Sequence, residues 1–321
     1  TWCRRGVDGF RCDAGYMIPV PAWRYIIASV RESFPDTIFF LEGLGGKISV
    51  TRELLNNAGF NWAYSELFQN YDRRQMEHYL PEAIAISRQD GALIHFAETH
   101  DNNRLAAQSP DYAAMRTALC ALFSEQGGFG FANGVEWFAT EKINVHDAGS
   151  LNWGSQHNQV DRIRRINHLL RSHPAFFDQT DLQMIQKGNG NSLVMLRHHR
   201  PTGKRLLIAV NLDIHGPGAA CWTERDAGFP CNGCRDLLTG QTVLPEKTGD
   251  LWRLEMSPGQ VCCLTPDGND DHIPEADASA AFSIPNRIRH QCLRALALDI
   301  HHFYHNTSDL DQFDPDRAAK A

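Results

Sequence analysis

Short apolar runs alternate with segments of helical periodicity through the first half of the chain. The apolar runs, typical of strands buried in a parallel sheet, span residues 7–10, 37–41, 60–64, 92–97 and 128–131. The segments with helical periodicity span residues 22–34, 73–88, 111–124 and 160–172, and Pro81 is expected to kink or break the second of them. Strands that alternate with helices in this way predict an α/β domain with a parallel sheet.

The period of the pattern changes to two at about Gln179. Alternating apolar and polar positions predict strands over residues 192–197, 205–211, 241–243, 251–256 and 260–264, separated by turns rich in Gly, Pro and Asn. This pattern is typical of an antiparallel β-sandwich. Residues 265–278 are rich in Asp, Gly and Pro and predict a linker, residues 286–304 predict one helix, and we expect disorder in the last residues. The chain therefore divides into residues 1–178, 179–265 and 266–321.

Composition narrows the classes of protein to which the chain could belong. Its 321 residues suffice for two domains, and a hydrophobic content of 42% is ordinary for a globular protein. A net charge of −7 without a basic block argues against nucleic acid as the main partner, and no apolar run reaches the length of a membrane-spanning helix. Nine cysteines indicate reduced thiols, and hence a cytoplasmic protein, rather than a disulfide framework. The Cys231–Cys234 pair lacks a second pair at finger spacing, so we expect no metal site there.

Three carboxylates each follow an apolar run, where a strand would lead into a loop. They are Asp13, Glu42 and Asp101. Glu42 follows Asp13 at about the length of one strand–helix–strand unit (roughly 30 residues), and Asp101 follows at about twice that spacing. Because the carboxyl ends of parallel strands meet at one edge, we expect these side chains to share one mouth, as catalytic residues do in barrel enzymes.

The residues around these carboxylates resemble the motifs of a known family. The strings are G-F-R-C-D at residues 9–13, F-F-L-E at residues 39–42 and A-E-T-H-D at residues 97–101. In this order they resemble strands four, five and seven of the alpha-amylase superfamily, glycoside hydrolase family 13, over about residues 6–265. The resemblance implies a partial TIM (β/α)8 barrel, about strands four to eight, in residues 1–178, followed by an all-β sandwich domain.

The resemblance also implies a retaining double-displacement mechanism, with Asp13 as nucleophile, Glu42 as acid/base and Asp101 as the carboxylate that holds the substrate hydroxyls. In such enzymes the carboxyl groups of the nucleophile and the acid/base lie about 5–5.5 Å apart. At the end of an apolar run, Glu42 would be desolvated and would keep its proton near neutral pH, as a general acid requires. The implied substrates are starch, glycogen and maltooligosaccharides.

Other residues near the expected mouth are candidates for substrate binding. Arg11 lies two positions before Asp13, on the same side of the strand, and would keep that carboxylate ionised. His100 resembles the family's ligand of a substrate hydroxyl, and Arg104 is expected to pair with one of the carboxylates. Aromatic side chains that follow the expected strands either stack on sugar rings or pack in the core and loops; they are Tyr16, Trp62, Tyr64 and Trp137.

Two features depart from the family pattern. Tyr16-Met17 stands where many members have Lys-His, which touches the acceptor sugar, so the preferred acceptor stays open. The family's first motif, after strand three, should precede Gly9, but only eight residues do so and the chain begins with Thr1 rather than Met. We therefore expect a longer parent protein that supplies the N-terminal half of the barrel. The family's calcium ion draws ligands from the missing motif and from the Lys-His region, so calcium is an option that the resemblance does not imply, and no cofactor is required.

Three functions are compatible with these observations. The first is an α-glucan-active glycoside hydrolase, acting within the longer parent protein. The second is a 4-α-glucanotransferase or a maltosyl-transferring relative, which uses the same carboxylates but passes the glycosyl unit to a sugar instead of water. The third is a non-catalytic glucan-binding or structural remnant, because strands one to three of the barrel are missing. For the first two, the partner is an α-glucan or maltooligosaccharide substrate.

Overall fold

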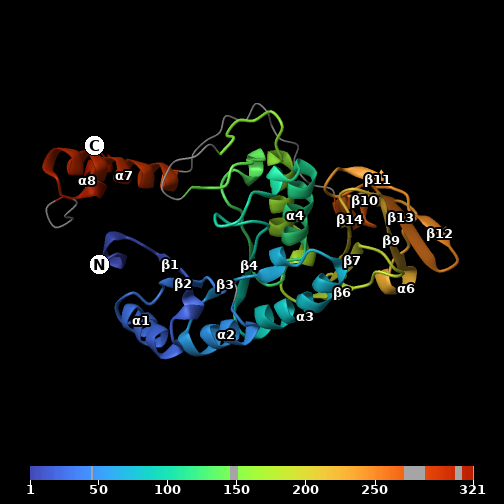
Figure 1. Cartoon of the computed structure of the whole chain (residues 1–321), viewed down its shortest axis with the longest axis horizontal. Coiled ribbons are helices and arrows are strands. Elements are labelled where there is room, and N and C mark those ends of the chain that lie inside the picture. Colours follow the sequence, from blue (N-terminus) through green and yellow to red (C-terminus); the bar gives the residue numbers. More distant parts are fainter. Residues whose placement is uncertain (45, 145–150, 271–285, 308–312, 321) are drawn as a thin grey trace. The chain divides into compact units, whose positions relative to one another are not determined.

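The computed structural model describes residues 1–44, 46–144, 151–270, 286–307 and 313–320 (Figure 1). The chain forms two compact units. The larger comprises Asp8–Ile273, and the smaller comprises Thr1–Val7 with Pro274–Ala321. The larger unit contains a parallel sheet with its helices and, after it in the chain, two antiparallel sheets.

Among the described residues, five parallel strands form the first sheet, in chain order from β1 to β5. Figure 1 labels β1 to β4 of this sheet. They are β1 (Gly9–Cys12), β2 (Ile38–Leu41), β3 (Trp62–Tyr64), β4 (Ala92–His95) and β5 (Gly128–Phe129). The helices between and after them are α1 (Val20–Ser33), α2 (Ile48–Glu53) with a π-helical turn at Leu54–Ala58, α3 (Arg73–Gln89), α4 (Pro110–Leu122) and α5 (Val160–Ser172). A parallel sheet that repeats strand and helix in chain order agrees with a partial (β/α)8 barrel.

Polar caps and buried side chains set the bounds of the helices. Asp72 and Gln75 form a capping box that starts α3, and the Ser109 side chain accepts a backbone hydrogen bond at the start of α4. Pro81 lies inside α3, and the helix continues through it, so the break expected there does not occur. Buried neighbours such as Leu80 hold the helix against the sheet and offset the hydrogen bond that proline removes.

Successive side chains along the parallel strands face opposite ways, and the two faces differ in burial. On one face, residues such as Leu41 are buried in the core against the helices. On the other face Phe40 and Tyr64 are partly exposed, so these strands are not buried on both sides as the apolar runs predicted. β1 spans Gly9–Cys12, two residues later than the predicted run, because its pairing with β2 extends from Gly9 opposite Ile38 to Cys12 opposite Leu41.

The two antiparallel sheets form the sandwich that the period of two predicted. One has the strand order β11-β10-β14-β8-β7-β6 and the other the order β12-β13-β9. Their bounds are β6 (Thr180–Met184), β7 (Ser192–His199), β8 (Arg205–Asn211), β9 (Gly218–Thr223), β10 (Cys234–Asp236), β11 (Gln241–Val243), β12 (Glu246–Thr248), β13 (Leu251–Met256) and β14 (Val261–Thr265), and the short helix α6 (Glu224–Ala227) follows β9. Apolar side chains of both sheets, Trp222 and Trp252 among them, form a core of their own. The sequence did not predict β6, β9, β10 or β12, because these strands are short, polar or made mostly of small residues.

Arg197 on β7 joins the sandwich to the helices around the parallel sheet. Its buried guanidinium donates hydrogen bonds to the carbonyl oxygens of Leu122 and Ser124, at 2.9 and 2.8 Å, and of Ala175, at 2.7 Å. The Glu125 carboxylate lies 3.9 Å away and supplies the opposite charge. A buried cation needs such partners to offset the loss of its hydration. These contacts therefore fix β7 against the end of α4.

His95 lies on the buried face of β4, and its burial leads us to expect that the protein becomes less stable as the pH falls below neutral. Burial, together with the positive charge of Arg197, lowers the pKa of its imidazole to about 3, far below the usual value of about 6.5. As the pH falls from about 6.5 to about 3, the unfolded chain therefore binds a proton at His95 that the folded chain does not. We expect the free energy of unfolding to decrease over this range, with a loss of about 2 kcal/mol at about pH 5 from this one group.

Urea titrations at neutral pH and at about pH 5 measure this loss. In a His95→Leu variant the loss between the two pH values should be smaller than in the wild type by about 2 kcal/mol. The same substitution at His78, which is exposed on α3, should leave the loss unchanged. An equal loss in the wild type and in His95→Leu would contradict the prediction.

In its described residues, the smaller unit holds the helices α7 (Asn286–His305) and α8 (Pro315–Lys320). Arg294 of α7 lies 3.1 Å from the Asp316 carboxylate of α8, and His301 stacks on Phe313. The helix expected over residues 286–304 is thus confirmed, whereas α8 lies where we expected disorder. Of the predicted linker, residues 265–270 end β14 and form a 3₁₀ turn, and residues 271–278 lie outside the described residues.

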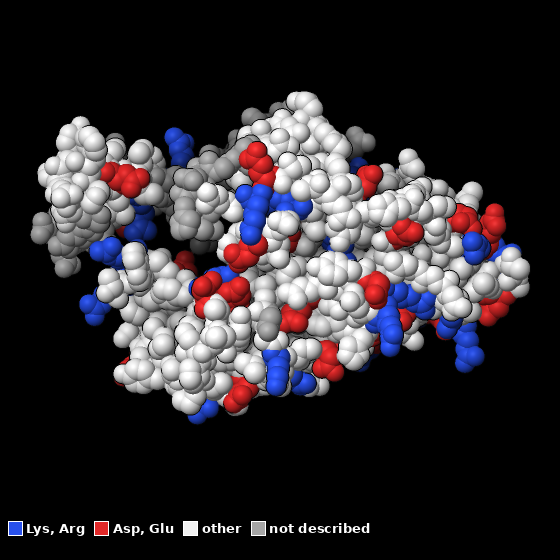
Figure 2. Space-filling view, viewed as in Figure 1, with Lys and Arg blue, Asp and Glu red and all other residues white. Residues whose placement is uncertain are grey.

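Charged side chains of both signs occur on the surface. On the face shown in Figure 2, Asp and Glu side chains are interspersed with Lys and Arg side chains. No helix in the described ranges combines the length and the hydropathy needed to cross a membrane.

Candidate active site

The ends of β1 and β2 bring Asp13 and Glu42 side by side. The two strands pair in parallel with Cys12 opposite Leu41, so each carboxylate is the next residue beyond that pair. Arg11 joins them, because its guanidinium contacts the Asp13 carboxylate and lies 3.1 Å from Glu42 Oε2. Two of the three predicted catalytic carboxylates therefore share one cationic side chain.

The backbone turn after β1 also holds Glu42. The Ala14 N–H donates a hydrogen bond of 2.7 Å to Glu42 Oε2. Ala14 has a left-handed conformation with φ 43°, which is costly for a residue with a β-carbon, so the surrounding structure must hold the turn. The turn thereby directs a backbone donor at the carboxylate that we predict to act as acid and base.

Asp13 and Glu42 differ in their environments. The Arg11 guanidinium beside Asp13 lowers the pKa of that carboxyl, which keeps it ionised at neutral pH, as a nucleophile must be. The Asp13 side chain is 80% exposed, whereas that of Glu42 is 15% exposed. Arg11 is a partner of Glu42 as well as of Asp13, which the sequence did not predict.

The loop after β4 carries the third carboxylate. His100 Nε2 lies 3.3 Å from Asp101 Oδ2. The Asp101 N–H donates to Thr99 Oγ1, and the Thr99 hydroxyl donates to Asn102 Oδ1 at 2.6 Å, so local hydrogen bonds shape this loop. His100 also contributes to the lowered pKa of Asp13, after the larger effect of Arg11. His100 lines one cavity together with Tyr64, and the Arg11 guanidinium lies over the Tyr64 ring, so the loop after β4 lies at the face of the sheet that carries Arg11.

Arg104 lies at the end of this loop, and its side chain is completely buried. Its guanidinium donates to Glu98 Oε1 at 2.7 Å and to the Asn133 carbonyl in the loop after β5. Glu98 also accepts a hydrogen bond of 2.6 Å from the Leu105 N–H, and burial raises the pKa of the Glu98 carboxyl. Arg104 therefore pairs with Glu98, and not with Asp13, Glu42 or Asp101 as the sequence predicted. Buried in this way, Arg104 holds two loops together and does not reach a substrate, which is the contact we had assigned to it.

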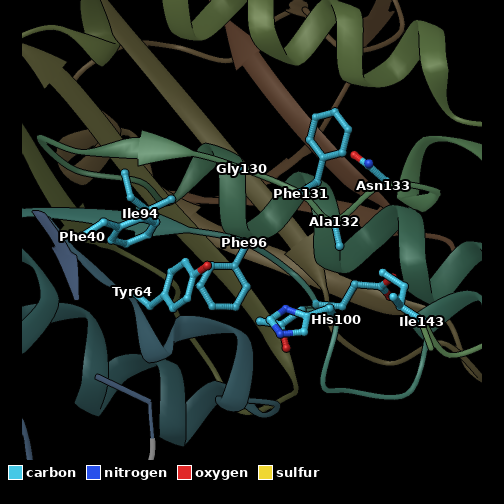
Figure 3. Close-up of a pocket in the computed structure, with 12 residues that line it drawn as sticks. Phe40, Tyr64, Ile94, Phe96, His100, Gly130, Phe131, Ala132, Asn133 and Ile143 are labelled. Atoms are coloured by element: carbon cyan, nitrogen blue, oxygen red, sulfur yellow. The ribbon is translucent and has the colours of Figure 1, made fainter. Parts of the chain in front are cut away.

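A cavity of about 360 Å³ opens beside these loops (Figure 3). Four phenylalanine or tyrosine rings line it, and three of them form a cluster. The rings of Phe40 and Tyr64 have centroids 4.4 Å apart, and that of Phe96 lies 4.8 Å from Tyr64; the fourth ring is that of Phe131. His100 and Asn133 supply polar groups to the lining. An aromatic wall with a few polar groups at its edge is typical of sites for small ligands.

The four aromatic residues predicted to stack on sugars lie in different places. Tyr64 lines the cavity. Trp62 starts β3, two positions before Tyr64 on the same face, and is 39% exposed. Tyr16 is half-buried and packs against the core. Trp137 is half-buried in the loop after β5 and lies against Trp153.

Phe40 and Phe96 also line the cavity, and the sequence motifs did not predict this role. The signal was present, because Phe40 lies two positions before Glu42 and Phe96 two positions after Ile94, on the same side of their strands. The position of Asn133 in the lining could not be predicted in this way, because Asn133 lies in a loop and the alternation of apolar and polar residues does not define the course of a loop. Within the described ranges, no three His, Cys, Asp or Glu side chains come together as a metal site.

The sequence of this chain was compared with protein-family models and with curated proteins. No protein-family model matches the chain. It is 28% identical over 227 residues to the alpha-1,4-glucan:maltose-1-phosphate maltosyltransferase of Cereibacter sphaeroides, a match that covers 67% of this chain and 37% of that protein. It is 26% identical over 235 residues to the protein of the same name from Rhodospirillum rubrum, covering 69% of this chain and 33% of that protein. The chain therefore spans about a third of the length of these curated relatives.

Solved structures share the fold at lower sequence identity. A maltogenic alpha-amylase, AmyB from Thermotoga neapolitana, matches with a TM-score of 0.61 and 14% identity over 82% of this chain and 62% of its own. An alpha-amylase from Lactobacillus plantarum matches with a TM-score of 0.59 and 17% identity over 82% of this chain and 63% of its own. Both matches extend across most of the chain, as a partial barrel followed by a β domain would require.

Proposed function

We propose that this chain, which resembles the alpha-amylase superfamily in both sequence and fold, carries the reacting carboxylates of a retaining enzyme. In the complete protein, this enzyme would act on the α-glucosidic bonds of starch, glycogen or maltooligosaccharides. The observation that carries the proposal is the placement of Asp13 and Glu42 at the ends of neighbouring parallel strands, joined by Arg11. The aromatic cavity beside them, of a size suited to a small ligand, supports it.

The proposed reaction has two steps. In the first, the ionised Asp13 carboxylate attacks the anomeric carbon while Glu42 gives its proton to the departing glycosidic oxygen. In the second, the ionised Glu42 takes a proton from the acceptor, which displaces Asp13 from the sugar. Arg11 favours the ionised form of Asp13 before the attack, and His100 and Asp101 would hold sugar hydroxyls. These steps require no cofactor.

The acceptor decides between two candidate functions. Water as the acceptor gives hydrolysis, and a sugar as the acceptor gives transfer. Transfer is favoured by a specific observation, since the similar curated proteins are named as maltosyltransferases that use an α-1,4-glucan and maltose 1-phosphate. Tyr16-Met17, in the region that touches the acceptor sugar in many family members, lies directly after the turn that holds Glu42.

Analysis of the products tests the proposal and separates these candidates. The complete protein is incubated with maltoheptaose, with and without maltose 1-phosphate, and the oligosaccharides are separated by chromatography. We expect longer oligosaccharides without a gain in reducing ends if the reaction is transfer, and a gain in reducing ends if it is hydrolysis. A folded protein that changes none of these sugars would contradict the proposal and favour a non-catalytic remnant.

A further inference from the structure

Trp153 lies on the segment between β5 and α5 and is 79% exposed. An indole of this size would normally bury much of its apolar surface, because burial of an aromatic side chain is strongly stabilising. One neighbour is the ring of Trp137, with centroids 5.5 Å apart and planes tilted by 42°. At 79% exposure, most of the Trp153 indole is open to a ligand.

The segment that carries Trp153 is held at both ends. Next to Trp153, the Asn152 side chain donates a hydrogen bond of 2.7 Å to the Trp137 carbonyl. At the other end, the Gln159 side chain donates to the Val135 carbonyl at 2.8 Å. Both acceptors belong to the 3₁₀ turn Val135–Trp137. Trp153 is therefore positioned by hydrogen bonds to a single turn.

That turn continues the loop that lines the cavity. Asn133, which lines the cavity, and Gly134 directly precede it. The Asn133 carbonyl accepts a hydrogen bond from the buried Arg104, and Gly134 packs closely against the Leu151 carbonyl. The segment with Trp153 is thus attached to the same loop as one wall of the candidate active site.

The residues around Trp153 have the chemistry that binds a sugar. The exposed residues that flank it in the chain include the polar side chains of Asn152, Gln156, His157 and Asn158. A pyranose ring offers an apolar C–H face, which packs on an indole, and hydroxyl groups at its edge, which pair with amides and imidazoles. An indole is rigid, so little conformational entropy is lost when a ligand packs on it.

We propose that Trp153, supported by Trp137, forms a stacking site for a glucose unit of a longer α-glucan chain, outside the cavity. The inference rests on the proposed function, because it takes the same class of ligand. Trp153 would give the glucan a second point of attachment, which a disaccharide bound in the cavity would not reach. The protein should therefore bind a long glucan more tightly than a disaccharide, and Trp153 should account for the difference.

Isothermal titration of the complete protein with maltoheptaose and with maltose tests the inference. Trp153→Ala should weaken the binding of maltoheptaose about tenfold, through the loss of one aromatic stacking contact, and leave the binding of maltose within about twofold. Trp153→Phe keeps an aromatic ring and should retain most of the affinity. Tyr25→Ala removes an aromatic residue on α1 that is 75% exposed, and should change neither affinity.

The outcomes separate this inference from the proposed function. If the wild type binds maltoheptaose and Trp153→Ala binds it equally well, the stacking site is refuted and the proposed function stands. An equal loss of affinity for both sugars would also refute it, because Trp153 would then act on the cavity or on the fold. If the wild type neither binds nor converts either sugar, the proposed function and the inference both fail.

Discussion

Replacing Asp13 by Asn in the complete protein is expected to lower the turnover of maltoheptaose at least about a thousandfold. An amide has nearly the shape of the carboxylate but cannot form the covalent bond to the sugar or stabilise the positive charge that develops on it. Asp13 is the carboxyl whose pKa the Arg11 guanidinium lowers, so the wild-type side chain is ionised and ready to attack at neutral pH. The rate of sugar release under saturating substrate measures the effect.

A matched control lies at the other end of the same strand. Asp8 is exposed and precedes β1, away from the carboxyl ends of the parallel strands. Asp8→Asn removes the same charge and should leave turnover within about twofold, because surface substitutions away from a site have small effects. Turnover of Asp13→Asn near that of Asp8→Asn, with both variants folded, would rule out Asp13 as the nucleophile.

A smaller side chain at the same position gives a second, chemical test. In Asp13→Gly, azide can enter the space left by the carboxylate and attack an activated substrate such as α-maltosyl fluoride. The product should be the β-linked azide, because only one displacement occurs and the configuration is inverted. An α-linked product would show that a nucleophile other than Asp13 still forms the intermediate.

Glu42→Gln is expected to lower the turnover of maltoheptaose by about a hundredfold to ten-thousandfold, the range typical of general acid catalysis. The departing sugar oxygen needs a proton, and an amide cannot give one. With α-maltosyl fluoride the departing fluoride needs no proton, so the first step should be much less affected. The ratio of the two turnover losses is therefore the quantity to measure.

The structure makes Glu42→Gln a clean substitution. The amide oxygen of Gln can still accept the hydrogen bond that the Ala14 N–H donates to Glu42, so the turn after β1 should keep its conformation. Glu32→Gln, at an exposed position on α1, is the matched control and should leave both turnovers unchanged. Equal losses for maltoheptaose and for the fluoride would contradict an acid role for Glu42.

Local pattern predicted much of the fold and part of the site. The helix expected over residues 160–172 and the strands expected over residues 205–211, 241–243 and 251–256 match α5, β8, β11 and β13. Asp13 and Glu42 could be placed together from sequence, because parallel neighbours in register bring their next residues to the same edge. These features depend on short-range periodicity and on one rule of sheet geometry.

By itself, then, the sequence determined the order of the parallel strands and of most of the helices between them, the change to a sandwich and the adjacency of two carboxylates. Only the tertiary structure decided that Arg104 pairs with Glu98 in the interior, that Arg197 joins the sandwich to α4, and that Trp137 supports an exposed Trp153. The physical reason lies in the approach of the segments that make these contacts. Each joins segments whose approach depends on the course of loops and on packing across the whole unit, and no period in the chain encodes that approach.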